Sequence, residues 1–105
     1  MGGINIKLWI DDVRPAPNTT EYLVAPSVNI AKTFIKDYED IDLPFELIDI
    51  DHDAGDWAEF GGDYIKLLDW LEETGRNYPI HIHSMNVIGV ENMRRIIQKN
   101  GWEEV

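Results

Sequence analysis

Residues 7–12 read KLWIDD, residues 47–53 read LIDIDHD, and residues 80–84 read IHIHS. Each stretch is a strand-like apolar run that ends in acidic or imidazole side chains. Parallel strands have their carboxyl ends at one edge of the sheet, and open α/β sheets bind ligands at that edge. The three stretches therefore predict one site, built from residues that lie far apart in the chain.

The rest of the pattern predicts four strands in total. We expect them at residues 4–10, 21–25, 45–51 and 80–83. The run at 45–51 is nearly continuous in apolar residues, which is typical of a strand covered on both faces. The Pro-rich segment 14–18 shows no helical period, so we expect an irregular connection between the first two strands.

Apolar residues at helical spacing predict three amphipathic helices. The first follows a candidate N-cap at Ser27, the second runs from Tyr64 to a C-terminal Gly75, and the third ends near Gly101. Strands that alternate with helices favour a parallel sheet with right-handed crossovers. Residues 54–62 between strand and helix are expected to form a loop, in which Trp57 and Phe60 either cover a ligand or, as we favour, pack against the body of the domain.

Composition limits the class of protein. The 105 residues, 44% of them hydrophobic, predict a single domain over 1–105. The absence of cysteine excludes disulfides, thiolate zinc sites and cysteine nucleophiles. No stretch approaches the ~20 apolar residues that span a membrane, so we expect a cytoplasmic protein that does not enter the bilayer.

The net charge of -11 comes from 20 acidic and 9 basic residues. Such a surface repels duplex nucleic acid. A small phosphorylated ligand or an RNA terminus remains compatible with it, because a bound divalent cation reverses the local sign of the charge. Solubility alone also accounts for the acidic balance, and an acidic surface suits a protein partner.

The acidic groups are candidate ligands of a hard cation. Asp11 and Asp12 follow the first strand, and Asp51 and Asp53 follow the third. Mg²⁺ uses few protein carboxylates and completes its shell with water and substrate. The alternative for Asp11 and Asp12 alone is a solvated turn or a cap. We prefer Asp51 as a ligand, with His52 beside it as a candidate acid or base.

The fourth strand contributes two histidines on one face, His81 and His83. They either bind a metal together or divide into one structural and one exposed side chain. His83 is nearer the carboxyl end and is the better site candidate. Asp49 lies within the third strand and is either a hydrogen-bonded structural acid or an inner member of the acidic cluster; the sequence leaves its role, and that of His81, open.

Three further residues are candidates for phosphate contacts. Arg14 follows the acidic pair and either binds a phosphate with two hydrogen bonds or forms a surface ion pair. Ser84 and Asn86 lead into the last helix, where free N–H groups bind anions; such residues also serve simply as helix caps.

With these residues in place, the chain resembles a response-regulator receiver domain. Receivers have an acidic pair after the first strand, a phosphoacceptor aspartate after the third and a Ser or Thr after the fourth; the matching residues are Asp11, Asp12, Asp51 and Ser84. The chain departs from receivers because the only lysine beyond Ser84 is Lys99, within the predicted last helix.

The chain is more similar to the cyclic-phosphate processing receiver domains. The similarity lies in LWIDDVRP at 8–15, DHD at 51–53, IHSMN at 82–86 and GVENM at 89–93. It extends over nearly the whole chain and implies a three-layer, flavodoxin-like α/β domain with strand order 2-1-3-4 and about three helices. It also implies a site in the crevice between the first and third strands, where the helices change sides.

The leading functional hypothesis is a metal-dependent phosphoesterase that acts on cyclic phosphates of nucleotides or RNA ends. Mg²⁺ or Mn²⁺ would be held by Asp11, Asp12 and Asp51, with Asp53 as a further candidate. His52 or His83 would protonate the leaving oxygen, and Arg14 would neutralise developing charge. Two alternatives stand beside it: a receiver-type phosphoacceptor that uses Asp51, and a non-catalytic module that binds a protein.

Overall fold

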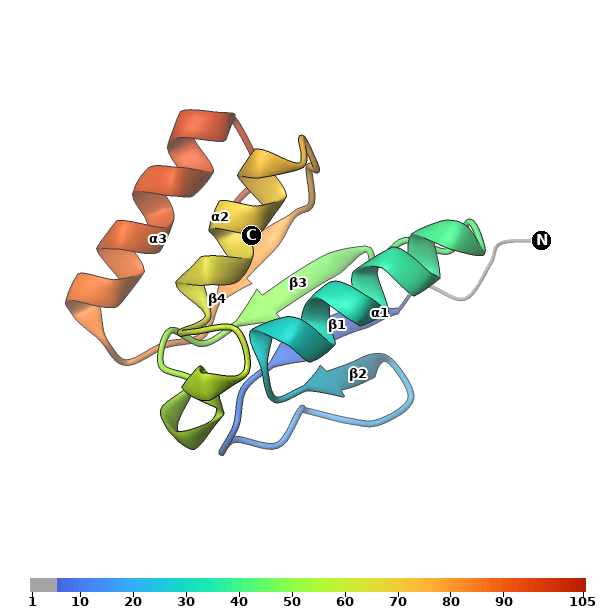
Figure 1. Cartoon of the computed structure of the whole chain (residues 1–105), viewed down its shortest axis with the longest axis horizontal. Helices are drawn as coiled ribbons and strands as arrows, with labels where there is room; N and C mark the ends of the chain where they lie inside the picture. Colours follow the sequence, from blue (N-terminus) through green and yellow to red (C-terminus); the bar gives the residue numbers. More distant parts are fainter. Residues whose placement is uncertain (1–5) are drawn as a thin grey trace.

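The computed structural model describes residues 6–105, which form one parallel sheet and three helices (Figure 1). The four strands lie in the order β2-β1-β3-β4. Their bounds are Lys7–Ile10 for β1, Tyr22–Ala25 for β2, Leu47–Ile50 for β3 and Ile80–Ile82 for β4. The helices are α1 at Val28–Asp40, α2 at Ile65–Glu73 and α3 at Val87–Asn100, with a short 3₁₀ helix, η1, at Gly55–Glu59.

The predicted fold class is confirmed. All strand pairs are parallel, the strand order is 2-1-3-4, and three helices accompany the sheet, as in receiver-like and flavodoxin-like domains. The first strand was expected to start at residue 4, but residues 4 and 5 lie outside the described part of the chain. Within residues 6–105, no helix is both long and apolar enough to cross a membrane.

The expectation of three layers is wrong, because all three helices lie on one face of the sheet. Helix α2 contacts both α1 and α3, and the three helices surround a single core with the strand residues Leu8, Ile10, Ile48, Ile50 and Ile80. Figure 1 shows α1 and α2 in front of the strands, with α3 beside α2. The described residues therefore form two layers of regular structure.

Right-handed crossovers explain this arrangement. The connections from β2 to β3 and from β3 to β4 move across the sheet in the same direction, so right-handedness places α1 and α2 on the same face. The connection from β1 to β2 moves in the opposite direction, and a helix there would lie on the other face. That connection is the Pro-rich loop, so the second helical layer is missing.

The helix-free face carries the alternate strand residues. Trp9 and Asp49 are register partners, and Asp49 is in turn the partner of His81, so their side chains share this face. The loop after β1 covers part of it, because Trp9 Nε1 donates a hydrogen bond to the backbone oxygen of Arg14 at 2.9 Å. The third strand is covered on both faces, as its apolar run predicts, because Ile48 and Ile50 are buried on the helical face and Asp49 is buried on the helix-free face.

The ends of the helices follow the predicted chemistry. Ser27 is the N-cap of α1, and its hydroxyl accepts a hydrogen bond from the Ile30 N–H at 3.1 Å. Gly101 ends α3 in the left-handed conformation, with φ of 69°. After α3 the chain returns beside β4, where Glu104 forms an isolated parallel bridge with Ile80.

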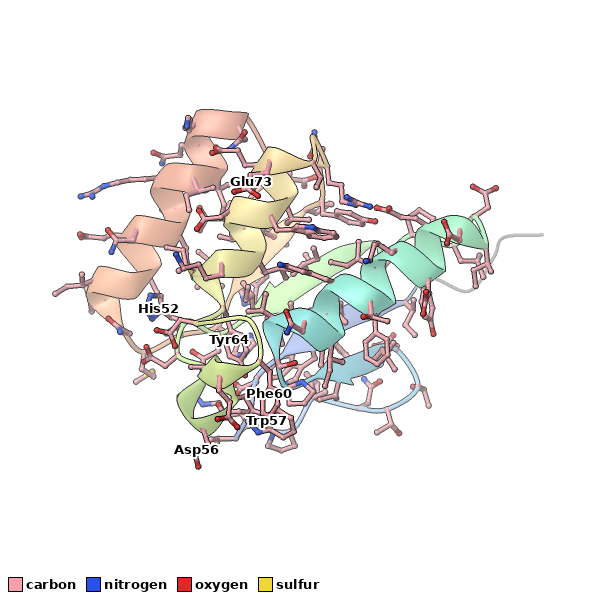
Figure 2. The ribbon with its side chains drawn as sticks, viewed as in Figure 1. His52, Asp56, Trp57, Phe60, Tyr64 and Glu73 are labelled. Carbon is pink, nitrogen blue, oxygen red and sulfur yellow. The ribbon has the colours of Figure 1, made fainter. Side chains whose placement is uncertain are left out.

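The predicted loop 54–62 contains η1, and its two aromatic side chains do not pack into the core. Trp57 is 37% exposed and Phe60 is 45% exposed, so the packing we favoured for them is wrong. Figure 2 shows the two rings close together at the surface of this turn, with centroids 5.5 Å apart.

Candidate functional site

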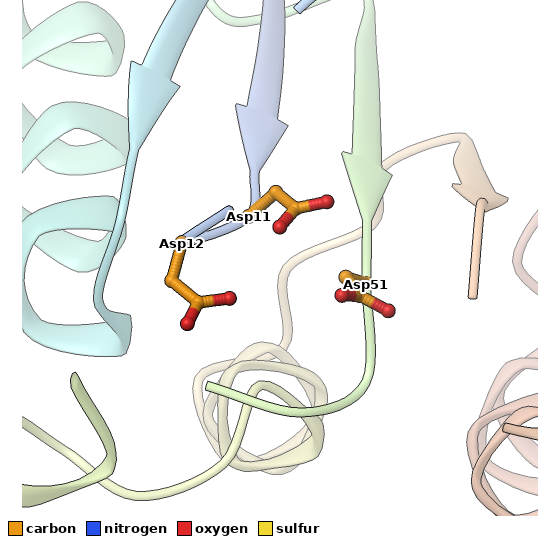
Figure 3. Close-up of side chains that lie close together, drawn as sticks. All are labelled: Asp11, Asp12 and Asp51. Atoms are coloured by element: carbon orange, nitrogen blue, oxygen red, sulfur yellow. The ribbon is translucent and has the colours of Figure 1, made fainter. Parts of the chain in front are cut away.

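Three carboxylates meet at the carboxyl ends of β1 and β3. One side-chain oxygen from each of Asp11, Asp12 and Asp51 lies within 4.8 Å of the other two. Figure 3 shows the first two residues just beyond the β1 arrow and Asp51 just beyond the β3 arrow. The stretches at 7–12 and 47–53 therefore converge as predicted, and Asp11, Asp12 and Asp51 are hereafter called the acidic cluster.

Asp11 is the most buried member of the cluster, with only 3% of its surface exposed. Its Oδ1 accepts hydrogen bonds from the N–H groups of Val13 and Arg14 at 2.9 and 3.2 Å, and its Oδ2 lies 3.0 Å from His83 Nε2. Burial raises the pKa of Asp11, but these hydrogen bonds outweigh it and hold the pKa below its ordinary value. Asp11 is therefore a fixed carboxylate.

Asp12 has the opposite electrostatic environment. Burial raises its pKa, and the neighbouring charges of Asp11, Asp51 and Asp56 raise it further. Within residues 6–105, neither Asp12 nor Asp51 forms an ion pair with a lysine or arginine. The negative charges of Asp12 and Asp51 are therefore not compensated by a lysine or arginine side chain in this part of the chain.

The turn after β3 approaches Asp12 closely. Gly55 has φ of 56°, and a Cβ at this position would lie 2.5 Å from Asp12 Oδ2. Only glycine adopts this conformation at low cost and leaves room for the carboxylate. Asp51 is also held locally, because its Oδ1 accepts a hydrogen bond from the His52 N–H at 2.8 Å.

His83 lies behind the acidic cluster, between two aspartates. Its Nδ1 is 2.6 Å from Asp49 Oδ1, its Nε2 faces Asp11, and its ring stacks on Trp9 with centroids 3.9 Å apart. Burial lowers the pKa of His83, but the hydrogen bonds and charges of Asp49 and Asp11 outweigh it and raise the pKa. Both ring nitrogens are therefore engaged with carboxylates.

His52 occupies a different position, at the start of α3. Its Nδ1 is 2.7 Å from Asp53 Oδ1, and a Cβ on Gly89 would lie 2.4 Å from its Cγ, so the ring packs directly on the helix backbone. No hydrogen bond of His52 Nε2 occurs within residues 6–105. Asp53 thus contacts the imidazole, and its oxygens are not among those that meet in the acidic cluster.

Four other residues considered from the sequence, Arg14, His81, Ser84 and Asn86, form hydrogen bonds outside the acidic cluster. Arg14 donates from its guanidinium to the backbone oxygen of His83 at 3.2 Å. Asn86 is the N-cap of α3 and accepts from the Gly89 N–H at 2.9 Å, while Ser84 Oγ accepts from the Asn86 N–H at 3.1 Å. His81 Nδ1 is 2.8 Å from the backbone oxygen of Val105, so it does not join the cluster.

Tyr64 is a core residue, as its spacing predicts, and within residues 6–105 it forms no hydrogen bond with the acidic cluster. It is fully buried, and its hydroxyl donates to the backbone oxygen of Pro26 at 2.7 Å. Burial raises the pKa of Tyr64, and the charges of Asp12, Asp11 and Asp51 raise it further, so the hydroxyl stays protonated. No sequence signal distinguishes this tyrosine from an apolar core residue.

A comparison with known protein families matches residues 6–99 to the cyclic-phosphate processing receiver domain. Comparisons with curated proteins and with solved structures gave no match. The matched range covers all four strands and the acidic cluster, and it ends one residue before the end of α3. The chain therefore belongs to the family of cyclic-phosphate processing receiver domains.

Proposed function

We propose that this domain is a metal-dependent phosphoesterase that opens cyclic phosphates on nucleotides or RNA ends. The observation that supports it most is the convergence of Asp11, Asp12 and Asp51 within 4.8 Å at the carboxyl edge of the sheet. The name of the family supplies the class of substrate. Localisation in the cytoplasm remains an expectation from the sequence.

The acidic cluster fits a hard divalent cation. Oxygen ligands are those that Mg²⁺ and Mn²⁺ prefer, and a cation would relieve the repulsion that contributes to the raised pKa of Asp12. Asp11, Asp12 and Asp51 would hold the ion. Asp53 was a fourth candidate, but its contact with His52 favours a role in orienting the imidazole. When bound, the ion would polarise a phosphoryl oxygen and lower the pKa of a water molecule.

The side chains of the protein would supply the proton transfer for the reaction. In the proposed hydrolysis, the water oxygen bonds to phosphorus, the bond from phosphorus to one ribose oxygen breaks, and the product is a phosphomonoester. The departing oxygen takes a proton from His52 Nε2, and the attacking water loses one to solvent. His52 suits this role better than His83, because both ring nitrogens of His83 face carboxylates.

Arg14, Ser84 and Asn86 are the candidate residues for binding the phosphate. Arg14 lies beyond the cluster and is exposed, so its guanidinium could exchange the His83 carbonyl for a phosphate oxygen. Asn86 and Ser84 would contribute through the turn that begins α3, whose first N–H groups face the ligand edge. A small phosphorylated ligand or an RNA terminus matches this arrangement better than a duplex.

The test is turnover of 2′,3′-cyclic nucleotides and of RNA with a cyclic-phosphate end, in Mg²⁺, Mn²⁺ and EDTA. We expect metal-dependent formation of a phosphomonoester. Asp51→Asn should abolish it, and His52→Gln should lower the rate by about 10²-fold or more. Asp37→Asn, an exposed change on α1, is the matched control and should retain full turnover. Wild-type activity no higher than that of Asp51→Asn would contradict the proposal.

Two competing hypotheses make different predictions. A phosphoacceptor switch predicts a mass increase after treatment with a small phosphodonor, lost in Asp51→Asn. It is weakened because Lys99, the only lysine beyond Ser84, pairs with Glu72 at 3.4 Å instead of reaching the acidic cluster. A non-catalytic protein-binding module predicts that Mn²⁺ and Mg²⁺ leave the melting temperature unchanged.

A further inference from the structure

Asp49 is a buried acid on the helix-free face of the sheet, and the proposed reaction does not use it. It lies within β3, with 5% of its surface exposed, and its Oδ1 is 2.6 Å from His83 Nδ1. A buried carboxylate is unfavourable unless a hydrogen-bonded or charged partner compensates it. His83 is that partner, so the two side chains form one unit.

Stacking on Trp9 fixes the plane of the His83 ring, and the contact with Asp49 fixes the rotation of the ring within that plane. The ring stacks on Trp9 with an interplanar angle of 5°, and Trp9 is itself anchored by its hydrogen bond to the Arg14 backbone and by edge contact with Tyr22. With Asp49 at Nδ1, the only direction left for Nε2 is toward Asp11, which it reaches at 3.0 Å. The imidazole therefore links β3 to the end of β1.

The contact between His83 and Asp11 determines which acceptor position of the Asp11 carboxylate remains unoccupied. A carboxylate offers about four acceptor positions. The N–H groups of Val13 and Arg14 occupy two positions on Oδ1, and His83 occupies one on Oδ2. The remaining position is on Oδ2, and its direction depends on where the imidazole holds that oxygen.

We propose that Asp49, acting through His83, is a positioning residue that holds the Asp11 carboxylate in the orientation required for metal binding. The proposal rests on the proposed function for the metal, but not on the reaction. Replacing a group that orients a metal ligand typically weakens metal binding by about 10- to 100-fold.

A double-mutant cycle read by calorimetric titration with Mn²⁺ alone tests this coupling. We expect Asp49→Asn and His83→Gln each to weaken Mn²⁺ binding by about 10- to 100-fold. The double variant should bind no more weakly than His83→Gln, because Asp49 acts only through the imidazole. His81→Gln is the matched control: it changes a histidine two residues before His83 whose ring contacts the Val105 backbone, and it should bind as wild type does.

A second measurement needs neither metal nor the variants. In imidazole ¹⁵N spectra of the metal-free wild type, the His83 Nδ1 proton should be protected from solvent exchange; free exchange would overturn the proposal. Losses of Mn²⁺ affinity that add in the double variant, or unchanged affinity in Asp49→Asn, would also overturn it. Intact coupling without turnover of cyclic phosphates would overturn the proposed reaction alone, and a wild type that does not bind Mn²⁺ would overturn both.

Discussion

Asp11 and Asp12 are adjacent acids, yet their replacement by asparagine should change stability in opposite directions. Both changes remove one negative charge from the acidic cluster. Repulsion between two carboxylates within 4.8 Å is about 1 kcal/mol at the dielectric constant of water and about 3 kcal/mol at an effective value of 20. Screening by salt reduces it. The lower figure applies to Asp12, which is partly exposed, so Asp12→Asn should stabilise the metal-free protein by about 1 kcal/mol.

Asp11→Asn obtains the same relief but disrupts hydrogen bonds to a buried carboxylate. Asparagine keeps an oxygen that can accept from the Val13 and Arg14 N–H groups, but it loses the acceptor that faces His83. A hydrogen bond to a charged group contributes about 1.5 to 3 kcal/mol, so after about 1 kcal/mol of relief we expect a net loss of about 0.5 to 2 kcal/mol.

The assay is urea unfolding of both variants and wild type at pH 7 in EDTA. Asp12→Asn should also melt about 4 °C higher than wild type, and its advantage should shrink as NaCl is added. With Mn²⁺ at 100 times its Kd, wild type should gain about 2.7 kcal/mol and the variants less. If both variants shift in the same direction in EDTA, or if Asp12→Asn is less stable than wild type, the assignment of repulsion to Asp12 and of anchoring to Asp11 is wrong.

Two further predictions concern the surroundings of the site and the opposite end of the domain. Gly89→Ala places a methyl group 2.4 Å from the His52 ring, so we expect an overpacking cost of about 1 to 3 kcal/mol, offset by about 1 kcal/mol of helix propensity, together with displaced His52 resonances in NMR spectra. Unchanged resonances would contradict this packing. Burial raises the pKa of Glu39, but its bonds to Arg76 and Tyr78 outweigh burial and lower it below 4.5. The stabilisation is therefore present above pH 4.5 and lost as the pH falls through the folded pKa. In urea unfolding, Glu39→Gln should lose about 1 kcal/mol at pH 7 and little at pH 3, and an equal loss at both would refute this account.

The position of the site could be predicted because it depends on topology. Strands that run parallel bring their carboxyl ends together whatever their exact register, so the convergence of Asp11, Asp12 and Asp51 follows from the order of strands and helices. The N-cap at Ser27 and the C-terminal glycine at Gly101 depend on local chemistry and were equally accessible.

The division of labour between the histidines depends on details that the sequence does not contain. His83 meets Asp49 only because β4 pairs with β3 in one register, with Ile50 beside Ile82, which brings His83 alongside the end of β3. A shift of one residue would turn its ring to the other face. The spacing of Trp57 and Phe60 likewise does not reveal whether a short turn presents them to the core or to solvent.

The Asp49–His83 pair lies on the face of the sheet that no helix of residues 6–105 covers, and the two features are related. A helix packed on that face would require apolar side chains at the positions of Trp9, Asp49 and His81, and an acid there would have to be desolvated beneath it. The Pro-rich loop instead offers backbone groups, including the Arg14 oxygen that accepts from Trp9. The loop thus anchors Trp9, and the Trp9 ring stacks on His83. Within residues 6–105, the helix-free face is the face on which Asp49 meets His83, whose other ring nitrogen faces Asp11.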